Sequence, residues 1–181
     1  MAKINITTKT GDKGTSRLFS GEEVSKDSLR LDAYGDLDEL VSMLSVARHH
    51  MSQEVLRADI LTLQKEIFTV AAELATTKNK LTKLPTRVDQ NFLNKLENRR
   101  ESLAQNTEIP TGFVIPGATL SAAYLDLARA ISRRCERKAV RLIEQNEIDN
   151  SLVIIWLNRL SDYLYLVARN EEKKPMLVKS I

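Results

Sequence analysis

Apolar residues recur every three or four positions over long stretches of the chain, which is the spacing of one face of an α-helix. The clearest stretch spans residues 53–75, where alternating steps of four and three form the seam of a bundle or coiled coil. Its apolar positions are Leu56, Ile60, Leu63, Ile67, Val70 and Leu74. This pattern predicts a helix whose role is structural.

A second stripe predicts a helix over residues 36–49, with apolar positions at Leu37, Leu40, Val41 and Leu44. Asp36 and Glu39 have capping-box spacing, although a start one turn earlier also fits the pattern. Asp38 falls in the first turn. An acidic side chain there stabilises a helix by a few tenths of a kcal/mol up to about 1, which would by itself explain an aspartate at this position.

Two further helices follow from the same spacing. Thr86 can cap a helix that ends near Gln105, with apolar positions at Val88, Phe92 and Leu96. The last helix is predicted over residues 150–170, and its inward positions are Val153, Leu157, Leu160, Leu164 and Val167. Residues 76–85 and 106–118 are the two long connections.

The longest helix is predicted over residues 119–143, because no glycine or proline interrupts this stretch. Its predicted core face consists of Leu120, Tyr124, Leu127 and Ile131. A second, ionic stripe on the same helix consists of Arg129, Arg133, Glu136 and Arg137, spaced at i, i+4, i+7 and i+8.

Six of the thirteen residues from 129 to 141 are basic, and only Glu136 is acidic. Arginine binds phosphate through its planar guanidinium fork, so this density suggests an anion site. A solvated basic face on a surface helix is the commoner origin of such a run. The helix alone therefore leaves both explanations open.

Together these stretches predict an all-α protein, a five-helix up-and-down bundle. A chain of 181 residues is expected to form a single domain over residues 1–181. Within it, residues 1–28 lack a helical period and form an irregular N-terminal segment. Residues 171–181 form a short, charged and loose tail.

Composition narrows the class of protein. Cys135 is the only cysteine, so the chain has no internal disulfide and no thiolate zinc cluster. The start lacks the apolar core of a signal peptide, and the longest apolar run, residues 152–157, is too short to cross a bilayer. We expect a cytoplasmic protein with no membrane partner. The net charge of +3 permits a nucleic-acid partner but does not require one, and scarce aromatics argue against a stacking platform.

Two loop segments carry candidate chemistry. Glycines, hydroxyls and cations crowd residues 9–17, where backbone N–H groups could surround an anion, although the P-loop spacing is absent. The alternative is an ordinary polar turn. Phe113 begins an apolar segment that ends in Pro116-Gly117, just before the arginine helix. That segment is either a plug over the core or the hydrophobic wall of a site.

Three groups of motifs along the chain are informative when they are taken together. The first is Thr10-Gly-Asp-Lys-Gly-Thr15, then Val24-Ser-Lys26, Ala33-Tyr-Gly35 and Asp38-Glu-Leu40. The second is Phe113-Val-Ile-Pro-Gly117, then Ala128-Arg129 and Arg133-Arg-Cys-Glu-Arg137. The third is Leu157-Asn-Arg-Leu-Ser-Asp-Tyr-Leu164. Taken together, these motifs resemble the PduO-type ATP:cob(I)alamin adenosyltransferases. Their order and spacing cover nearly the whole chain, which makes the resemblance specific.

The resemblance implies a five-helix bundle that assembles as a homotrimer with active sites between subunits. It implies transfer of the 5′-deoxyadenosyl group of ATP to the cobalt of cob(I)alamin, with release of triphosphate. The implied ligands are ATP as co-substrate, Mg²⁺, and cobalamin or another corrinoid as substrate. The implied partners are a corrinoid reductase or flavoprotein electron donor and an adenosylcobalamin-dependent acceptor enzyme, with no nucleic acid.

The resemblance also assigns roles to residues of this sequence. The phosphates of ATP would be enfolded by Thr10, Gly11, Lys13, Gly14, Thr15 and Lys26. ATP would also be contacted by Arg133, Arg137 and Asn158, with Glu136 organising the site through Mg²⁺. Asp38 and Arg129 would form an ion pair across the subunit boundary. Phe113 would lie under the corrin and displace the lower axial ligand, which makes cobalt(II) easier to reduce.

The residue chemistry agrees with this resemblance, because cob(I)alamin is itself a strong nucleophile and needs no catalytic base. The sequence departs from the family pattern at Lys9, Ser20-Gly21, Ser28-Leu29, Val41 and Ala118. The departure at Val41 removes a polar contact near Asp38, so it affects the corrinoid-binding part of the site more than the ATP-binding part. Two rivals remain, namely a regulatory bundle that binds ATP without turnover and a basic helical protein that binds RNA or DNA.

Overall fold

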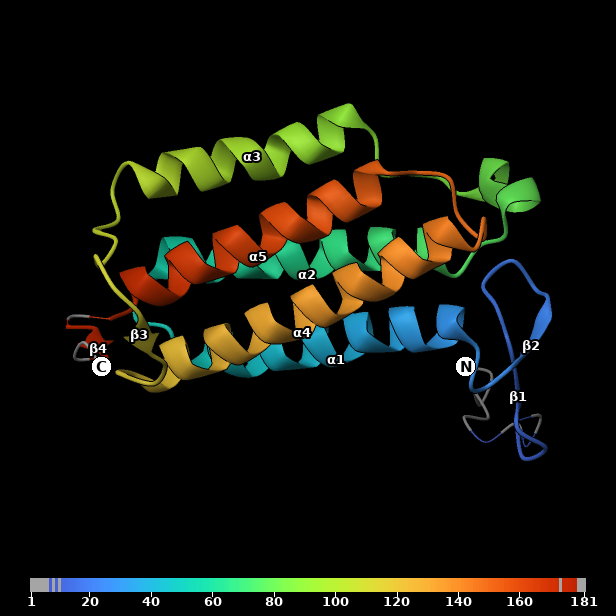
Figure 1. The fold of residues 1–181 in the computed structure, drawn as a ribbon, viewed down its shortest axis with the longest axis horizontal. Helices are drawn as coiled ribbons and strands as arrows, with labels where there is room; N and C mark the ends of the chain where they lie inside the picture. The colour runs from blue at the N-terminus through green and yellow to red at the C-terminus, as the bar shows by residue number, and fades with distance from the viewer. Residues whose placement is uncertain (1–6, 8, 10, 173, 179–181) are drawn as a thin grey trace, which may run out of the picture.

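The computed structural model has five long helices, and successive helices along the chain run in alternating directions about a common axis (Figure 1). The structure describes residues 7, 9, 11–172 and 174–178. The helices are α1 Leu29–His50, α2 Glu54–Leu74, α3 Gln90–Ala104, α4 Leu120–Glu144 and α5 Leu152–Asn170. A short 3₁₀ helix, η1 Lys78–Lys83, lies between α2 and α3. The predicted all-α five-helix bundle is therefore confirmed.

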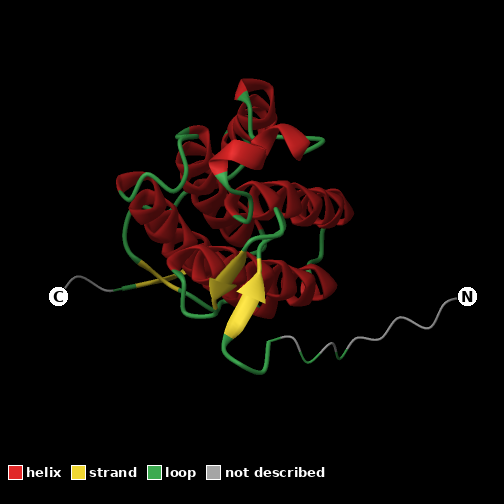
Figure 2. Ribbon diagram, turned by 90° about the vertical axis from the view of Figure 1, so that its right-hand side faces the viewer, coloured by secondary structure: helices red, strands yellow, loops and turns green. Residues whose placement is uncertain are grey.

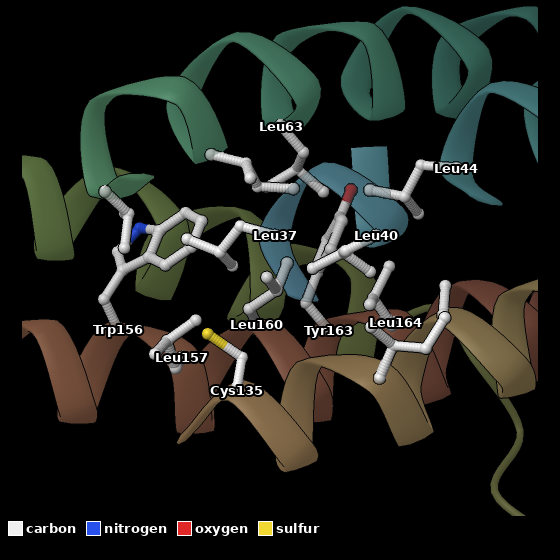
Figure 3. Close-up of a cluster of buried hydrophobic side chains, with 14 of the residues drawn as sticks. Leu37, Leu40, Leu44, Leu63, Cys135, Trp156, Leu157, Leu160, Tyr163 and Leu164 are labelled. Carbon is white, nitrogen blue, oxygen red and sulfur yellow. The ribbon is translucent and has the colours of Figure 1, made fainter. Parts of the chain in front are cut away.

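The helices pack in the order α2, α1, α4, α5 and α3. The core between them is rich in leucine, and α5 supplies its largest side chains, Trp156 and Tyr163 (Figure 3). Every apolar position predicted for residues 53–75 and for the last helix is buried. Phe92 of α3 packs on Trp156 with 5.6 Å between ring centroids, which fastens α3 to the bundle.

The start of α1 differs from the prediction. Ser28 caps this helix by accepting a hydrogen bond from the N–H of Leu31, two turns before Asp36. Asp36 is instead buried inside the helix, where it pairs with Arg134 at 3.1 Å and Lys138 at 2.9 Å. Its role is interhelical because the chain is already helical for seven residues before it.

The first turn of α1 is fixed by a buried arginine. Arg30 donates to the carbonyls of Leu74 and Thr76 at 2.6 and 3.1 Å, and these groups end α2. It also donates to the carbonyl and the carboxylate of Glu147, each at 2.7 Å, in the α4–α5 connection. One guanidinium thus ties three helix ends together.

The start of α3 also differs from the prediction. Asp89, not Thr86, caps this helix, accepting from the N–H of Phe92 at 2.7 Å. Glu73 of α2 explains the later start, because its carboxylate accepts from the N–H of Val88 at 2.8 Å and from Arg87 at 2.7 Å. These contacts hold residues 87 and 88 outside the helix.

The predicted core face of α4 is partly wrong. Ile131 is buried, but Leu120 and Leu127 are 54% and 47% exposed. The face that packs on α1 and α5 consists largely of small residues, among them Ala122, Ala128, Ser132, Cys135 and Ala139. Small side chains let helices approach closely, so they form the contact surface that the leucine spacing did not reveal.

Two short antiparallel strand pairs lie at opposite ends of the bundle. β1 Thr15–Arg17 and β2 Glu23–Ser25 form a hairpin beyond the start of α1, which faces the viewer in Figure 2. β3 Val114–Ile115 pairs with β4 Met176–Leu177 at the other end. The predicted loose tail is therefore wrong for β4. Among the described residues, no helix is long and apolar enough to span a bilayer.

Candidate active site

The basic residues of α4 have two different surroundings. Arg134 and Lys138 point to α1, where they pair with Asp36, and Arg134 also pairs with Glu39. Burial disfavours the charged form of Lys138, but its contacts with Asp32 and Asp36 outweigh this and raise its pKa. Arg133 and Arg137 are exposed and have no hydrogen-bond or ion-pair partner within the described chain. Their guanidinium groups are thus available to a ligand.

Glu136 and Asn158 lie side by side because α4 and α5 are packed antiparallel neighbours. The Asn158 amide nitrogen donates to the Glu136 carboxylate at 3.2 Å, and its amide oxygen accepts from Arg159 at 3.0 Å. The side chain of Asn158 therefore has a fixed orientation. With Arg133 and Arg137, these residues place charged and polar groups along one α4–α5 surface.

The N-terminal loop folds back on itself. The N–H of Lys26 donates to the carbonyl of Gly14 at 2.8 Å, and Gly14 has a positive φ of 81°, which favours glycine. A Cβ on Gly11 would lie 2.9 Å from the Lys26 ammonium nitrogen and 3.2 Å from the Thr15 carbonyl oxygen, so a larger residue would displace the lysine side chain and crowd the loop backbone. Thr15 begins β1, and Lys13 is exposed. Thr10 lies outside the described residues.

A polar anchor holds this hairpin to the end of α2. Ser20 Oγ accepts from the N–H of Thr77 at 3.2 Å, and the Ser20 carbonyl accepts from Lys80 at 3.0 Å. Glu22 accepts from Thr77 Oγ1 at 2.8 Å and pairs with Lys80 at 2.8 Å. Lys80, followed by Ser20, lowers the pKa of Glu22 to about 2. Sequence reasoning missed this anchor because its members lie more than fifty residues apart.

The N-terminal loop and the ionic stripe of α4 do not meet within one chain. The loop lies beyond the start of α1, whereas Arg133 and Arg137 lie along the body of α4 (Figure 1). No hydrogen bond or ion pair joins described residues 11–26 to either arginine. The predicted ATP-binding residues therefore form two separate half-sites.

Asp38 and Arg129 are also apart in the single chain. Asp38 is exposed and has no ion pair among the described residues. Arg129 reaches Asp126 at 3.4 Å, and Asp126 is in turn held by Arg169 at 2.5 Å. The predicted Asp38–Arg129 pair therefore does not form inside one subunit.

Phe113 is 86% exposed, so the interpretation as a plug over the core is wrong. Its backbone is nevertheless held, because the Phe113 carbonyl accepts from the N–H of Val178 at 2.8 Å, next to the β3–β4 pair. An ordered backbone with a fully presented aromatic ring fits the other interpretation, a hydrophobic wall.

The described residues include no cluster of three or more His, Cys, Asp or Glu side chains that could hold a metal ion. Glu136 thus offers a single carboxylate. Mg²⁺ commonly takes one or two carboxylates and completes its shell with substrate phosphates and water, so one carboxylate beside a polyphosphate is compatible with that ion.

The profile of the cobalamin adenosyltransferase family matches residues 6–171 of the chain. The chain belongs to this family. It is 38% identical to the corrinoid adenosyltransferase of Citrobacter freundii, over 94% of this chain and 96% of the relative. It is also 38% identical to the corrinoid adenosyltransferase of Bacillus subtilis, over 92% of this chain and 86% of the relative.

Solved structures of the same family share the fold. A phenylalanine-to-alanine variant of the PduO-type ATP:corrinoid adenosyltransferase from Lactobacillus reuteri, complexed with cobalamin and ATP, superposes with a TM-score of 0.87. The two chains are 31% identical, and the match covers 97% of this chain and 100% of that one. An arginine-to-lysine variant of the same enzyme, complexed with ATP, gives a TM-score of 0.85.

Proposed function

We propose that the chain transfers the 5′-deoxyadenosyl group of ATP to the cobalt of a reduced corrinoid. Its relatives are corrinoid adenosyltransferases over nearly their full length, and a neighbour of matching fold binds cobalamin and ATP. Cobalt(I) supplies the electron pair that attacks C5′ of the ribose. The Co–C bond forms as the C5′–O bond breaks, and triphosphate leaves with that oxygen, so atoms and charges balance.

The protein's task is to align these groups and to stabilise the departing anion, because the nucleophile needs no base. The unpaired guanidinium groups of Arg133 and Arg137 would bind the phosphates. Asn158, oriented by Glu136 and Arg159, would hold the nucleotide. The loop with Thr10, Gly11, Lys13, Gly14, Thr15 and Lys26 would surround the triphosphate.

The separation of the two half-sites is the observation that supports an assembly of several subunits, which we propose to be a homotrimer. An N-terminal loop that cannot reach the α4 arginines of its own chain can reach those of a neighbour across a subunit boundary. The same contact would let Asp38 pair with Arg129 of the next subunit. The exposed Leu120 and Leu127 would then be covered. Light scattering at micromolar concentration should give three times the chain mass, and a fully active monomer would rule this assembly out.

Phe113 would form the lower wall of the corrinoid site. Its ring is exposed in the single chain. In the complex, the ring would exclude water and the nucleotide base from the lower face of cobalt. Loss of the lower axial ligand makes cobalt(II) easier to reduce to cobalt(I). Adding cob(II)alamin to protein and ATP should therefore shift the optical spectrum to the four-coordinate form, and an unchanged spectrum would contradict this role.

Glu136 would hold Mg²⁺ together with phosphate oxygens, and the ion would neutralise charge on the triphosphate. The carboxylate already accepts from Asn158, so it would contact metal and nucleotide-binding amide together. Magnesium titration should lower the KM for ATP in the native enzyme, with a much smaller effect in Glu136→Gln.

The wider setting follows from the chemistry. Cobalt(I) requires a reductase or flavoprotein electron donor, and the product serves an adenosylcobalamin-dependent enzyme. We place the reaction in the reducing cytoplasm, which suits a single buried free cysteine. We also propose that residues 1–181 act as one adenosyltransferase domain, with residues 1–28 as its nucleotide loop and 171–181 as its tail.

One assay separates this function from its rivals. ATP, a corrinoid and a strong reductant are incubated with the protein, and triphosphate and the light-sensitive Co–C product are measured. Both should appear in equal amounts. ATP binding without triphosphate would instead indicate a regulatory bundle. A nucleic-acid binder would show steeply salt-dependent affinity for RNA or DNA and no response to corrinoid.

A further inference from the structure

A pocket of about 300 Å³ opens between α3, α4 and α5 and brings together three arginines from two helices. Arg129 and Arg133 come from α4, and Arg100 comes from α3. Asp162 and Tyr165 of α5 complete its polar lining. We refer to this cavity, defined by Arg100, Arg129, Arg133 and Asp162, as the three-arginine pocket. Arg100 is the only one of the three arginines that the sequence motifs did not identify as a candidate site residue.

The positive charge of this pocket is poorly compensated. Arg133 has no partner in the described chain, and Arg129 reaches Asp126 only at 3.4 Å. Arg100 reaches only the exposed carboxylate of Glu101, at 3.6 Å. The lining contains three guanidinium groups and one carboxylate, Asp162. Arg100 and Arg133 still lack a good partner if Arg129 pairs with Asp38 of the next subunit, as proposed above. Like charges gathered in this way favour an anionic ligand.

The neighbouring arginine on α3 shows the contrast. Arg99 pairs with Glu66 of α2 at 2.5 Å, and both side chains are less than a fifth exposed. Arg100 follows it directly but turns to α4 and α5 instead. The helix thus carries one guanidinium with a partner in the fold and one without a good partner.

The pocket matches a phosphate group in size and chemistry. Guanidinium groups bind phosphate oxygens through paired N–H donors, and guanidinium groups approaching from two helices can engage different oxygens of one phosphate. A volume of about 300 Å³ is at the lower end for small-molecule sites, too small for a whole corrinoid. It suits one charged portion of a larger substrate.

We propose that Arg100 is a further phosphate-binding residue of the adenosyltransferase site and acts beside Arg133. This inference rests on the proposed function, which assigns Arg133 to ATP. The phosphate has two chemical sources in the reaction, the triphosphate of ATP and the phosphodiester in the nucleotide loop of cobalamin. Cobinamide lacks that phosphodiester, so substrate choice distinguishes the two sources.

The test compares Arg100→Gln with the matched control Arg99→Gln in the full-length protein. Titration calorimetry with inorganic triphosphate gives a Kd, and steady-state assays give KM for ATP, cobalamin and cobinamide. Loss of a charge-assisted hydrogen bond should weaken phosphate binding about tenfold in Arg100→Gln. Its melting temperature should stay unchanged. Arg99→Gln should show the reverse, a lower melting temperature with unchanged Kd and KM.

The pattern across substrates identifies the source of the phosphate. A rise in the Kd for triphosphate and the KM for ATP assigns Arg100 to the polyphosphate. A rise in the KM for cobalamin but not for cobinamide assigns it to the phosphodiester. Arg100→Lys should recover part of the loss in either case, because the charge returns without the fork.

The variant Arg133→Gln distinguishes a failure of the Arg100 proposal from a failure of the proposed function. If Arg133→Gln weakens triphosphate binding while Arg100→Gln changes none of these constants, Arg100 has no role and the proposed function stands. If neither variant changes any constant, both the phosphate role of Arg100 and the assignment of Arg133 are wrong.

Discussion

Arg133 and Arg134 are consecutive on α4 but serve different surfaces of it. Arg134 lies against α1, where Asp36 and Glu39 pair with it. Arg133 lines the three-arginine pocket on the α3–α5 side and has no partner in the described chain. A basic run in a sequence can therefore mix residues that hold helices together with residues left for a ligand. The partner across the helix interface, and not the run itself, separates the two kinds.

Two phenylalanines differ in the same way, one packed in the core and one exposed, and their substitution should give the largest difference in the free energy of unfolding. Phe92 is buried against Trp156, so Phe92→Ala should lower the free energy of unfolding by about 3–5 kcal/mol. Phe113→Ala should change it little because the ring is 86% exposed. Denaturant melts of both variants check this. Equal destabilisation would show that Phe113 is covered in the native protein.

Phe113→Ala should instead affect the chemistry of cobalt. The loss of activity should be greatest when the assay starts from cob(II)alamin, since the variant admits a lower ligand during reduction. It should be milder with cob(I)alamin generated beforehand. Equal losses in both assays would contradict a role in reduction.

Arg133→Ala should give the next largest effect. A lost donor to developing negative charge typically costs about 2–4 kcal/mol, which is roughly a 30- to 1,000-fold loss of kcat/KM. The melting temperature should not change, because no described group pairs with Arg133. Arg133→Lys should recover only part of the rate. Native rates in the lysine variant would mean that a point charge suffices.

Arg134→Ala is the structural counterpart and should have a smaller effect. It leaves buried Asp36 with Lys138 as its remaining ion-pair partner in the described chain. Because Arg134 is nearly half exposed, we expect a loss of about 1–2 kcal/mol in the free energy of unfolding. Activity per folded molecule should stay native. A large kinetic defect in the folded variant would remove the distinction between the two arginines.

The smallest effect concerns the hairpin anchor. Glu22→Gln should raise the KM for ATP severalfold and leave that for corrinoid unchanged, because the pair with Lys80 is lost. The pKa of Glu22 is about 2 in the fold, below its usual 4.5. The anchor is thus complete above about pH 4.5 and is lost as pH falls towards 2. The protection of the Thr77 amide against hydrogen exchange, taken relative to the intrinsic rate at each pH, should fall in that range in the native protein, and unchanged protection would contradict the anchor.

The fold was predictable where burial and spacing agree. The stripe of α2 and the inward residues of α5 are large, apolar and fully packed, so periodicity alone locates them. The same reasoning failed in part on α4, where alanine, serine and Cys135 make up much of the packed face, beside Leu125, Ile131 and Leu142, while Leu120 and Leu127 remain exposed. Small residues carry no hydrophobic signal strong enough to compete with leucine.

The candidate site was predictable only by residue type. The resemblance placed Arg133, Arg137, Asn158 and Glu136 together, and the α4–α5 pairing is consistent with it. No local pattern could show that Arg99 has a partner and Arg100 lacks a good one, because that difference depends on Glu66 of another helix. The predicted starts of α1 and α3 were wrong for a similar reason, because Ser28 and Asp89 each cap a helix through a single hydrogen bond from the backbone.

The β3–β4 pair has a consequence for the entropy of substrate binding. Ordering one residue of backbone costs about 1–2 kcal/mol. Val114 and Ile115 are ordered by Leu177 and Met176, and Val178 holds the carbonyl of Phe113. On the proposed function, folding has already met that cost before a corrinoid arrives. Residues 176–178 would then raise corrinoid affinity without touching the ligand, and a chain shortened before Met176 would bind more weakly while remaining folded.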